Sequence, residues 1–162
     1  MPAKDWCNFA YTLVGSSDAT VGSKVVASPG SKVKTTYKLN SSTQLWDQNV
    51  YIDGTLKSSV HTSKGQKGWL FYISLECASG TCGKVGAHST YPGALSGYVN
   101  DADSIVEWED VTITLAKADM NFKHSGSWEY KATGGQMSTS DNGKTWTLST
   151  LSIPAMKVPA TT

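Results

Sequence analysis

The amino-acid sequence predicts an all-β protein, a two-sheet antiparallel β-sandwich of the jelly-roll or concanavalin-like kind. Apolar and polar side chains alternate with a period of two along several segments, as they do in half-buried strands. Glycine, asparagine and aspartate separate these segments at short intervals, and no segment carries the apolar stripe of a long helix. At 162 residues the chain is expected to form one domain, residues 1–162.

The first half of the chain has the clearest strand signals. Residues 32–39 place Val33, Thr35, Tyr37 and Leu39 on one face and three lysines on the other. Residues 45–52 and 55–60 flank Asp53-Gly54, which favours a type I′ turn, so they are predicted to form a hairpin.

Further elements are expected towards the C-terminus and near the N-terminus. We predict strands at 9–14, 24–27, 69–75, 104–115 and 128–132, and a second hairpin that joins 136–140 to 145–153 through Asn142-Gly143. Residues 77–103 are rich in glycine and weakly periodic. They are predicted to form a long loop, and loops of this length often carry function.

Charge and composition exclude some classes of partner. All fourteen basic residues are lysine, and thirteen acidic residues leave a net charge of +1. Without arginine or a basic surplus, the chain lacks the features that bind nucleic acid. No apolar run reaches the roughly 18 to 20 residues of a membrane span. We therefore expect no nucleic-acid and no membrane partner, and a secreted protein whose signal peptide is not part of this chain.

Cysteine spacing predicts one disulfide. Cys77 and Cys82 bracket a short loop that contains glycine, and a bridge between them is expected. A metal or redox pair is the alternative, but four intervening residues do not match CxxC and no second Cys or His pair completes a metal site. Cys7 is left as a buried thiol or as the partner of a cysteine outside this chain. No metal and no cofactor are expected.

Asn40-Ser41-Ser42 matches the N-glycosylation sequon and lies between two predicted strands. A glycan on Asn40 would fit a secretory history.

An acidic cluster surrounds Trp108. Strict alternation over 104–115 places Glu107 and Glu109 on the face of Val111, opposite to Trp108. Two carboxylates roughly 6–7 Å apart on an apolar face would suit acid–base chemistry. The alternative is that both carboxylates lie in water. Whichever face of the strand points to the core, an unusual side chain is left there, so residues 104–110 are the predicted site. Trp108→Ala is expected to weaken ligand binding with little change in melting temperature.

Aromatic side chains exceed what one sandwich core of this size easily holds. Some are predicted to line a cleft for a sugar or an apolar small molecule. The candidate ligand-binding residues are Trp46, Trp69, Tyr72, Tyr91, Tyr98 and Trp108. The alternative is a core of large residues with a few exposed rings. His88, in the long loop, is a candidate catalytic residue beside Glu107, whereas His61 and His124 are interpreted as surface residues.

The segment Trp46-Asp47-Gln48-Asn49-Val50-Tyr51-Ile52-Asp53-Gly54, with Glu76-Cys77 and residues 82–88, resembles small secreted fungal β-sandwich proteins of concanavalin-like topology. These proteins are distantly similar to the glutamic peptidases called eqolisins. That family acts through a Gln and Glu pair, for which Gln48 and Glu107 are the counterparts here. Some proteins of this kind act as cofactor-free cyclases of the Diels–Alder type in natural-product pathways.

Three functions follow as hypotheses. The first is a cofactor-free cyclase, which needs mainly shape, orientation and a few donors. The second is a lectin-like carbohydrate-binding module, and the third is a relative of the glutamic peptidases. No nucleophile elbow or other hydrolase signature occurs, so a hydrolytic triad has no support in the sequence. The aromatic side chains make a small-molecule or sugar ligand the expected partner.

Overall fold

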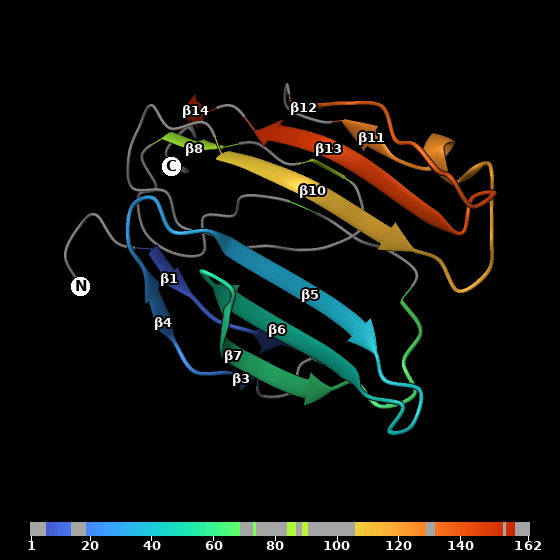
Figure 1. Ribbon diagram of the computed structural model, residues 1–162. Helices are drawn as coiled ribbons and strands as arrows, with labels where there is room; N and C mark the ends of the chain where they lie inside the picture. Colours follow the sequence, from blue (N-terminus) through green and yellow to red (C-terminus); the bar gives the residue numbers. More distant parts are fainter. Residues whose placement is uncertain are drawn as a thin grey trace, which may run out of the picture. The chain divides into compact units, whose positions relative to one another are not determined.

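The computed structural model describes residues 6–13, 19–68, 73, 84–86, 89–90, 106–128, 132–153 and 155–157. The chain divides into two compact units, Met1–Gly68 and Trp69–Thr162, and their described strands pair antiparallel (Figure 1). Each unit has its own cluster of buried apolar side chains. The all-β prediction is confirmed, and the strands are consistent with a β-sandwich. The jelly-roll or concanavalin-like topology and the single domain stay predictions.

The first unit is built around one three-stranded sheet. Its strands are β1 (Trp6–Asn8), β2 (Tyr11–Thr12), β3 (Thr20–Val21), β4 (Val25–Ala27), β5 (Val33–Leu39), β6 (Trp46–Ile52) and β7 (Thr55–Thr62). The sheet has the order β5-β6-β7, while β1 pairs with β4 and β2 with β3 (Figure 1). The strand predicted at 32–39 and the hairpin predicted after it are therefore confirmed.

A tight turn at Asp53-Gly54 sets the register of β6 against β7 as far as Tyr51, and a bulge between Val50 and Tyr51 shifts it by one residue for the rest of the pair. Both residues have positive φ, 50° and 79°, as a type I′ turn requires. Asp53 also ties this turn to the start of β5, because its Oδ1 accepts the N–H of Lys32 at 2.8 Å and its own N–H donates to the Lys32 carbonyl at 2.9 Å. Directly opposed residues of the three strands therefore share a face, in rows such as Tyr37–Gln48–Val60.

One face of this sheet supplies the core of the first unit. The buried residues on it are Val50, Ile52, Ser58 and Val60. Ser58 is satisfied despite its burial, because its Oγ accepts the N–H of Ala10 at 3.1 Å. The apolar side chains of the edge strand β5 on the same face are more exposed, with Val33 at 44% and Tyr37 at 43%. Burial is therefore concentrated under β6 and β7.

The second unit is organised around the long pair β10–β13. Its described elements are β8 (Lys84–Gly86), β9 (Ser89–Thr90), β10 (Val106–Thr114), the 3-10 helix η1 (Phe122–His124), β11 (Ser127–Trp128), β12 (Thr133–Gly134), β13 (Thr145–Ile153) and β14 (Ala155–Lys157). β13 lies between β10 and β12 (Figure 1). The strand predicted at 145–153 is confirmed. The hairpin predicted between 136–140 and 145–153 forms only in part, because a single antiparallel bridge, Ser138 to Thr147, stands in place of the strand predicted at 136–140.

Strand β10 changes face at Asp110, so the strict alternation expected over 104–115 is wrong. Asp110 has a φ of 53° and is missing from the ladder between β10 and β13. The buried cluster of this unit consists of Ile73, Ala132, Leu148, Leu151 and Ile153. Trp108 and Val111 both pack against that cluster, although three positions separate them. Glu107, Glu109 and Asp110 are exposed, which confirms the interpretation that the two glutamates lie in water.

The turn before β13 is held by its own side chains. A carboxylate oxygen of Asp141, Oδ1, accepts the N–H of Thr145 at 2.7 Å and the hydroxyl of Thr139 at 3.0 Å. The Thr139 hydroxyl oxygen in turn accepts the N–H of Gly143 at 3.0 Å. These contacts, the Thr145 N–H first, hold the pKa of Asp141 below its ordinary value. Thr139 and Asp141 therefore hold the turn that joins Ser138 to β13.

We expect Gly143→Ala to destabilise the fold more than Gly54→Ala. Both glycines have positive φ, 84° and 79°, so either substitution strains the backbone by about 1–2 kcal/mol. A Cβ on Gly54 would meet nothing within 4 Å, whereas one on Gly143 would lie 2.7 Å from the carbonyl carbon and oxygen of Asp119. Thermal unfolding followed by circular dichroism should show the larger fall in Tm for Gly143→Ala. Equal falls would contradict the close packing of Gly143 on Asp119.

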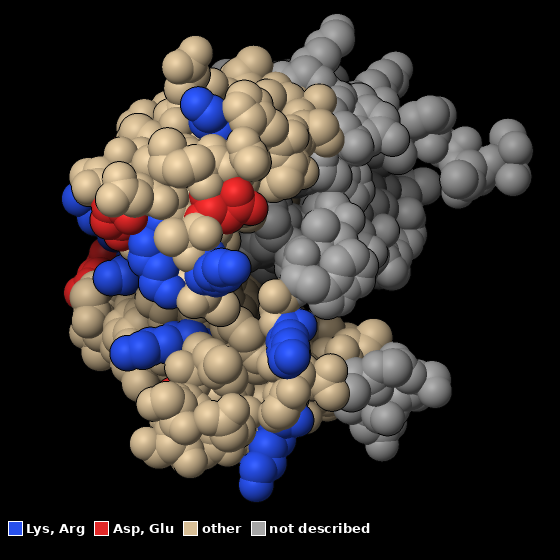
Figure 2. Space-filling model, turned by 90° about the vertical axis from the view of Figure 1, so that its right-hand side faces the viewer, with Lys and Arg blue, Asp and Glu red and all other residues tan. Residues whose placement is uncertain are grey.

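Much of the described surface is uncharged. Charged residues make up 17% of the chain, and in Figure 2 the lysines and acidic residues stand out from a surface that is mostly neutral. A ligand that contacts such a surface meets mainly hydroxyl, amide and apolar groups. A candidate binding site on this surface is therefore expected where polar side chains cluster.

Candidate functional site

The face of β5-β6-β7 opposite the core is polar, and we take it as the candidate site. This polar face carries Lys34, Thr36, Lys38, Asp47, Asn49, Tyr51, Ser59 and His61, in rows fixed by the strand register. None of the eight residues is buried, and the lysines and the histidine are exposed. Donors, acceptors and one aromatic ring therefore share one accessible sheet face.

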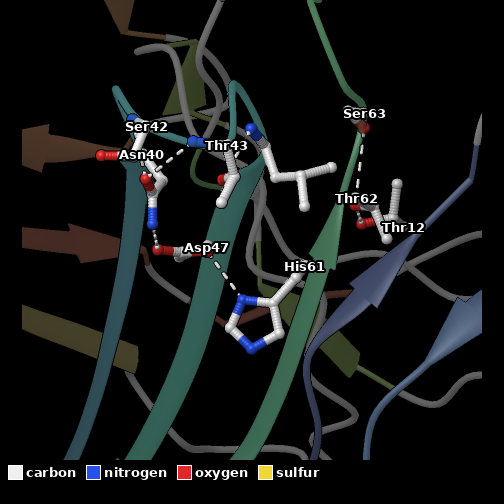
Figure 3. Close-up of polar contacts among 9 residues, drawn as sticks. Thr12, Asn40, Ser42, Thr43, Asp47, His61, Thr62 and Ser63 are labelled. Atoms are coloured by element: carbon white, nitrogen blue, oxygen red, sulfur yellow. Dashed lines mark hydrogen bonds and ion pairs between the residues drawn. The ribbon is translucent and has the colours of Figure 1, made fainter.

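A contact between a histidine and a carboxylate orders one end of the polar face. Nδ1 of His61 lies 2.6 Å from Oδ1 of Asp47, and Nδ2 of Asn40 donates to Oδ2 of the same carboxylate at 3.3 Å (Figure 3). The side chain of His61 is 57% exposed and that of Asp47 is 23% exposed. A carboxylate on Nδ1 fixes the orientation of the imidazole, and it leaves Nε2 available to a ligand.

The same contacts set the protonation of Asp47. The hydrogen bond from His61 is the largest cause that lowers the pKa of Asp47 below its ordinary value, and Asn40 and the charge of Lys38 act in the same direction. Partial desolvation opposes them. Asp47 therefore stays a carboxylate, and an acceptor, throughout the neutral and mildly acidic range.

Asn40 connects the polar face to the turn between β5 and β6. Its Oδ1 accepts the N–H groups of Ser42 and Thr43 at 3.0 and 3.1 Å, so it shapes the turn as an asparagine often does (Figure 3). Its Nδ2, the atom that would carry a glycan, donates to Asp47. Glycosylation of Asn40 stays a prediction.

Two predicted site residues lie on the opposite face of the same sheet. Trp46 is partly buried, and its Nε1 donates to the carbonyl of Gln66 at 3.0 Å. Gln48 donates from Nε2 to the hydroxyl of Thr12, which also accepts the hydroxyl of Thr62 at 2.9 Å. These contacts give both side chains a structural use, linking the sheet to β2 and to the segment after β7. The ligand role of Trp46 and the catalytic role of Gln48 stay predictions.

Glu107 and Trp108 belong to the second unit, whereas Gln48 belongs to the first. Glu107 is exposed, opposite Ser152 of β13. Trp108 packs against the buried cluster, because β10 changes face at Asp110. Replacing Trp108 with alanine should therefore lower the melting temperature, in contrast to the small change expected from the sequence. Residues 104–110 were predicted as a site because strict alternation puts Trp108 and Val111 on opposite faces of the strand. In the structure both side chains lie on the core side.

The remaining sequence-predicted residues lie outside the described residues. These are His88, Trp69, Tyr72, Tyr91, Tyr98, Cys77 and Cys82, together with most of the predicted loop 77–103. The disulfide and the aromatic cleft therefore stay predictions, and so does the cyclase hypothesis that depends on them. Cys7 is described, and it is a partly buried free thiol. His61 and His124 are exposed, as predicted.

Comparison with known proteins gives no relative: no family model, no curated protein and no solved structure matches the chain. Within the described residues, no group of three or more His, Cys, Asp or Glu side chains is placed to hold a metal ion. No helix there has the length and apolarity to cross a membrane.

Sequence reasoning missed the residues at the centre of this face. Asn49 and Tyr51 were not singled out, and His61 was interpreted as a surface residue. The signal was present in the predicted hairpin, because alternation along β6 puts Asp47, Asn49 and Tyr51 on one side. The lysine face predicted for residues 32–39 belongs to the same surface once the strands are paired.

A titration tests the ion pair. Because the pKa of Asp47 is depressed, the contact should be fully present above the ordinary carboxylate pKa, near about 3.9, and be lost only as the pH falls through the lowered value. In His61→Ala the Asp47 midpoint, measured by NMR of the carboxyl carbon, should move up towards the ordinary value. His124→Ala, which removes another exposed histidine, should leave it unchanged. The same midpoint in the parent and in His61→Ala would rule out the pair.

Proposed function

We propose that this chain is a lectin-like carbohydrate-binding module whose ligand lies on the polar face of β5-β6-β7. The observation that carries the proposal is the row of alternate residues Asp47, Asn49 and Tyr51 along β6. Alternate residues of a strand lie roughly 6–7 Å apart on one face. The row as a whole spans about twice that distance, which suits contacts with more than one unit of a sugar chain.

The chemistry of the three residues suits a sugar. Sugar hydroxyls both donate and accept, so a carboxylate such as Asp47 and a carboxamide such as that of Asn49 offer complementary partners. The apolar C–H face of a sugar ring packs on an aromatic ring, and Tyr51 supplies one beside Leu56, whose side chain is 50% exposed. His61 adds Nε2, which Asp47 holds in a fixed orientation.

Glycan binding of matched variants tests the proposal. A glycan array should identify ligands of the parent protein, and calorimetry with the strongest of them should show that Tyr51→Ala and Asn49→Ala each bind about tenfold more weakly, since each removes a central contact. The melting temperature should stay close to that of the parent, because neither residue is buried.

Tyr11→Ala is the matched control. Tyr11 lies on β2, is 46% exposed and is outside the polar face, so its removal should leave glycan binding unchanged. A parent protein that binds no glycan would refute the proposal. Equal losses for Tyr51→Ala and Tyr11→Ala would also contradict it, because they would show a general effect of removing an exposed aromatic ring.

A further inference from the structure

The polar face carries more positive than negative charge. Lys34 and Lys38 are both exposed, and the register places Lys34 opposite Tyr51 and Lys38 opposite Asp47. No salt bridge involves either lysine within the part of the chain that the structure describes. Lys38 contributes to the field that lowers the pKa of Asp47, but it is not bonded to that carboxylate. Both ammonium groups are therefore available to a ligand.

The carboxylate of the face already has hydrogen-bond partners within the protein. This carboxylate, Asp47, is bonded through one oxygen to His61 and through the other to Asn40. The nearest acidic residue along β6, Asp53, lies in the following turn and accepts the backbone N–H of Lys32. A ligand that approaches Asn49 and Tyr51 thus meets two unpaired cations on the neighbouring strand.

We infer that the ligand is an anionic polysaccharide, one that bears carboxylate or sulfate groups. The inference depends on the proposed carbohydrate-binding function and adds its ligand class. The lysines would bind the anionic groups, while Tyr51 and Asn49 bind the sugar ring and its hydroxyls. Because the chain has no arginine, the cations are flexible point charges without a bidentate geometry.

Three polysaccharides test whether the ligand is anionic and which acidic group it bears. Polygalacturonate carries carboxylates, dextran sulfate carries sulfates, and dextran is uncharged. The parent protein should bind both anionic polymers more tightly than dextran, and the binding should weaken as salt is raised. The double variant Lys34→Ser/Lys38→Ser should bind them about tenfold more weakly at low salt, because it removes both cations from the face. Binding of only one anionic polymer, with the same loss in the double variant, would support the inference and identify the acidic group.

The double variant Lys117→Ser/Lys123→Ser is the control, since it removes the same charge from exposed positions outside this sheet. It should bind as the parent does. Equal losses in the two double variants would overturn the inference, because they would show a response to net charge alone. Binding of dextran that needs Tyr51 and Asn49 but neither lysine would also overturn it, and the proposed function would stand. Binding of all polymers that is unaffected by Tyr51→Ala and Asn49→Ala would instead refute the proposed function.

Discussion

The register of β6 between β5 and β7 is the constraint on which both the core and the candidate site of the first unit depend. Side chains alternate along a strand, so a slip of one residue would carry Asp47, Asn49 and Tyr51 to the buried face. The Asp53-Gly54 turn, with φ positive at both residues, fixes one end of β6, and the Asn40 turn fixes the other. The pairing of β6 with β5 and β7 therefore determines which side chains are buried in the core and which lie on the polar face.

The parts of this sheet that depend on neighbouring residues in the chain could be predicted from the sequence. The Asp53-Gly54 turn and the alternation of residues 32–39 predicted the strands that carry the polar face. The contact between Asp47 and His61 was not predictable in the same way, because a bulge between Val50 and Tyr51 shifts the pairing of the predicted hairpin and brings His61 opposite Asp47. Its partner Asn40 was noticed as a glycosylation site, whereas its structural use, to shape a turn and hold a carboxylate, appears only in the folded chain.

The second unit shows how one backbone angle changes a functional interpretation. Counting alternate positions through residues 104–115 put Trp108 and Val111 on opposite faces and made an unusual site of the acidic cluster. A left-handed residue at Asp110 puts both on the core side and leaves Glu107 in solvent. Aspartate tolerates this conformation better than most residues. The amino-acid type permits the change of face, but periodicity alone does not reveal it.

The polar face is explained better by binding than by folding. Exposed ion pairs contribute little to stability, and the register of the sheet is already fixed by its turns and by the buried residues Val50 and Val60. Yet Asp47 is held within hydrogen-bond distance of both His61 and Asn40, which come from different segments of the chain. Side chains ordered before a ligand arrives lose less conformational entropy when it binds. An arrangement that adds little stability but fixes accessible polar groups is therefore what a recognition surface requires.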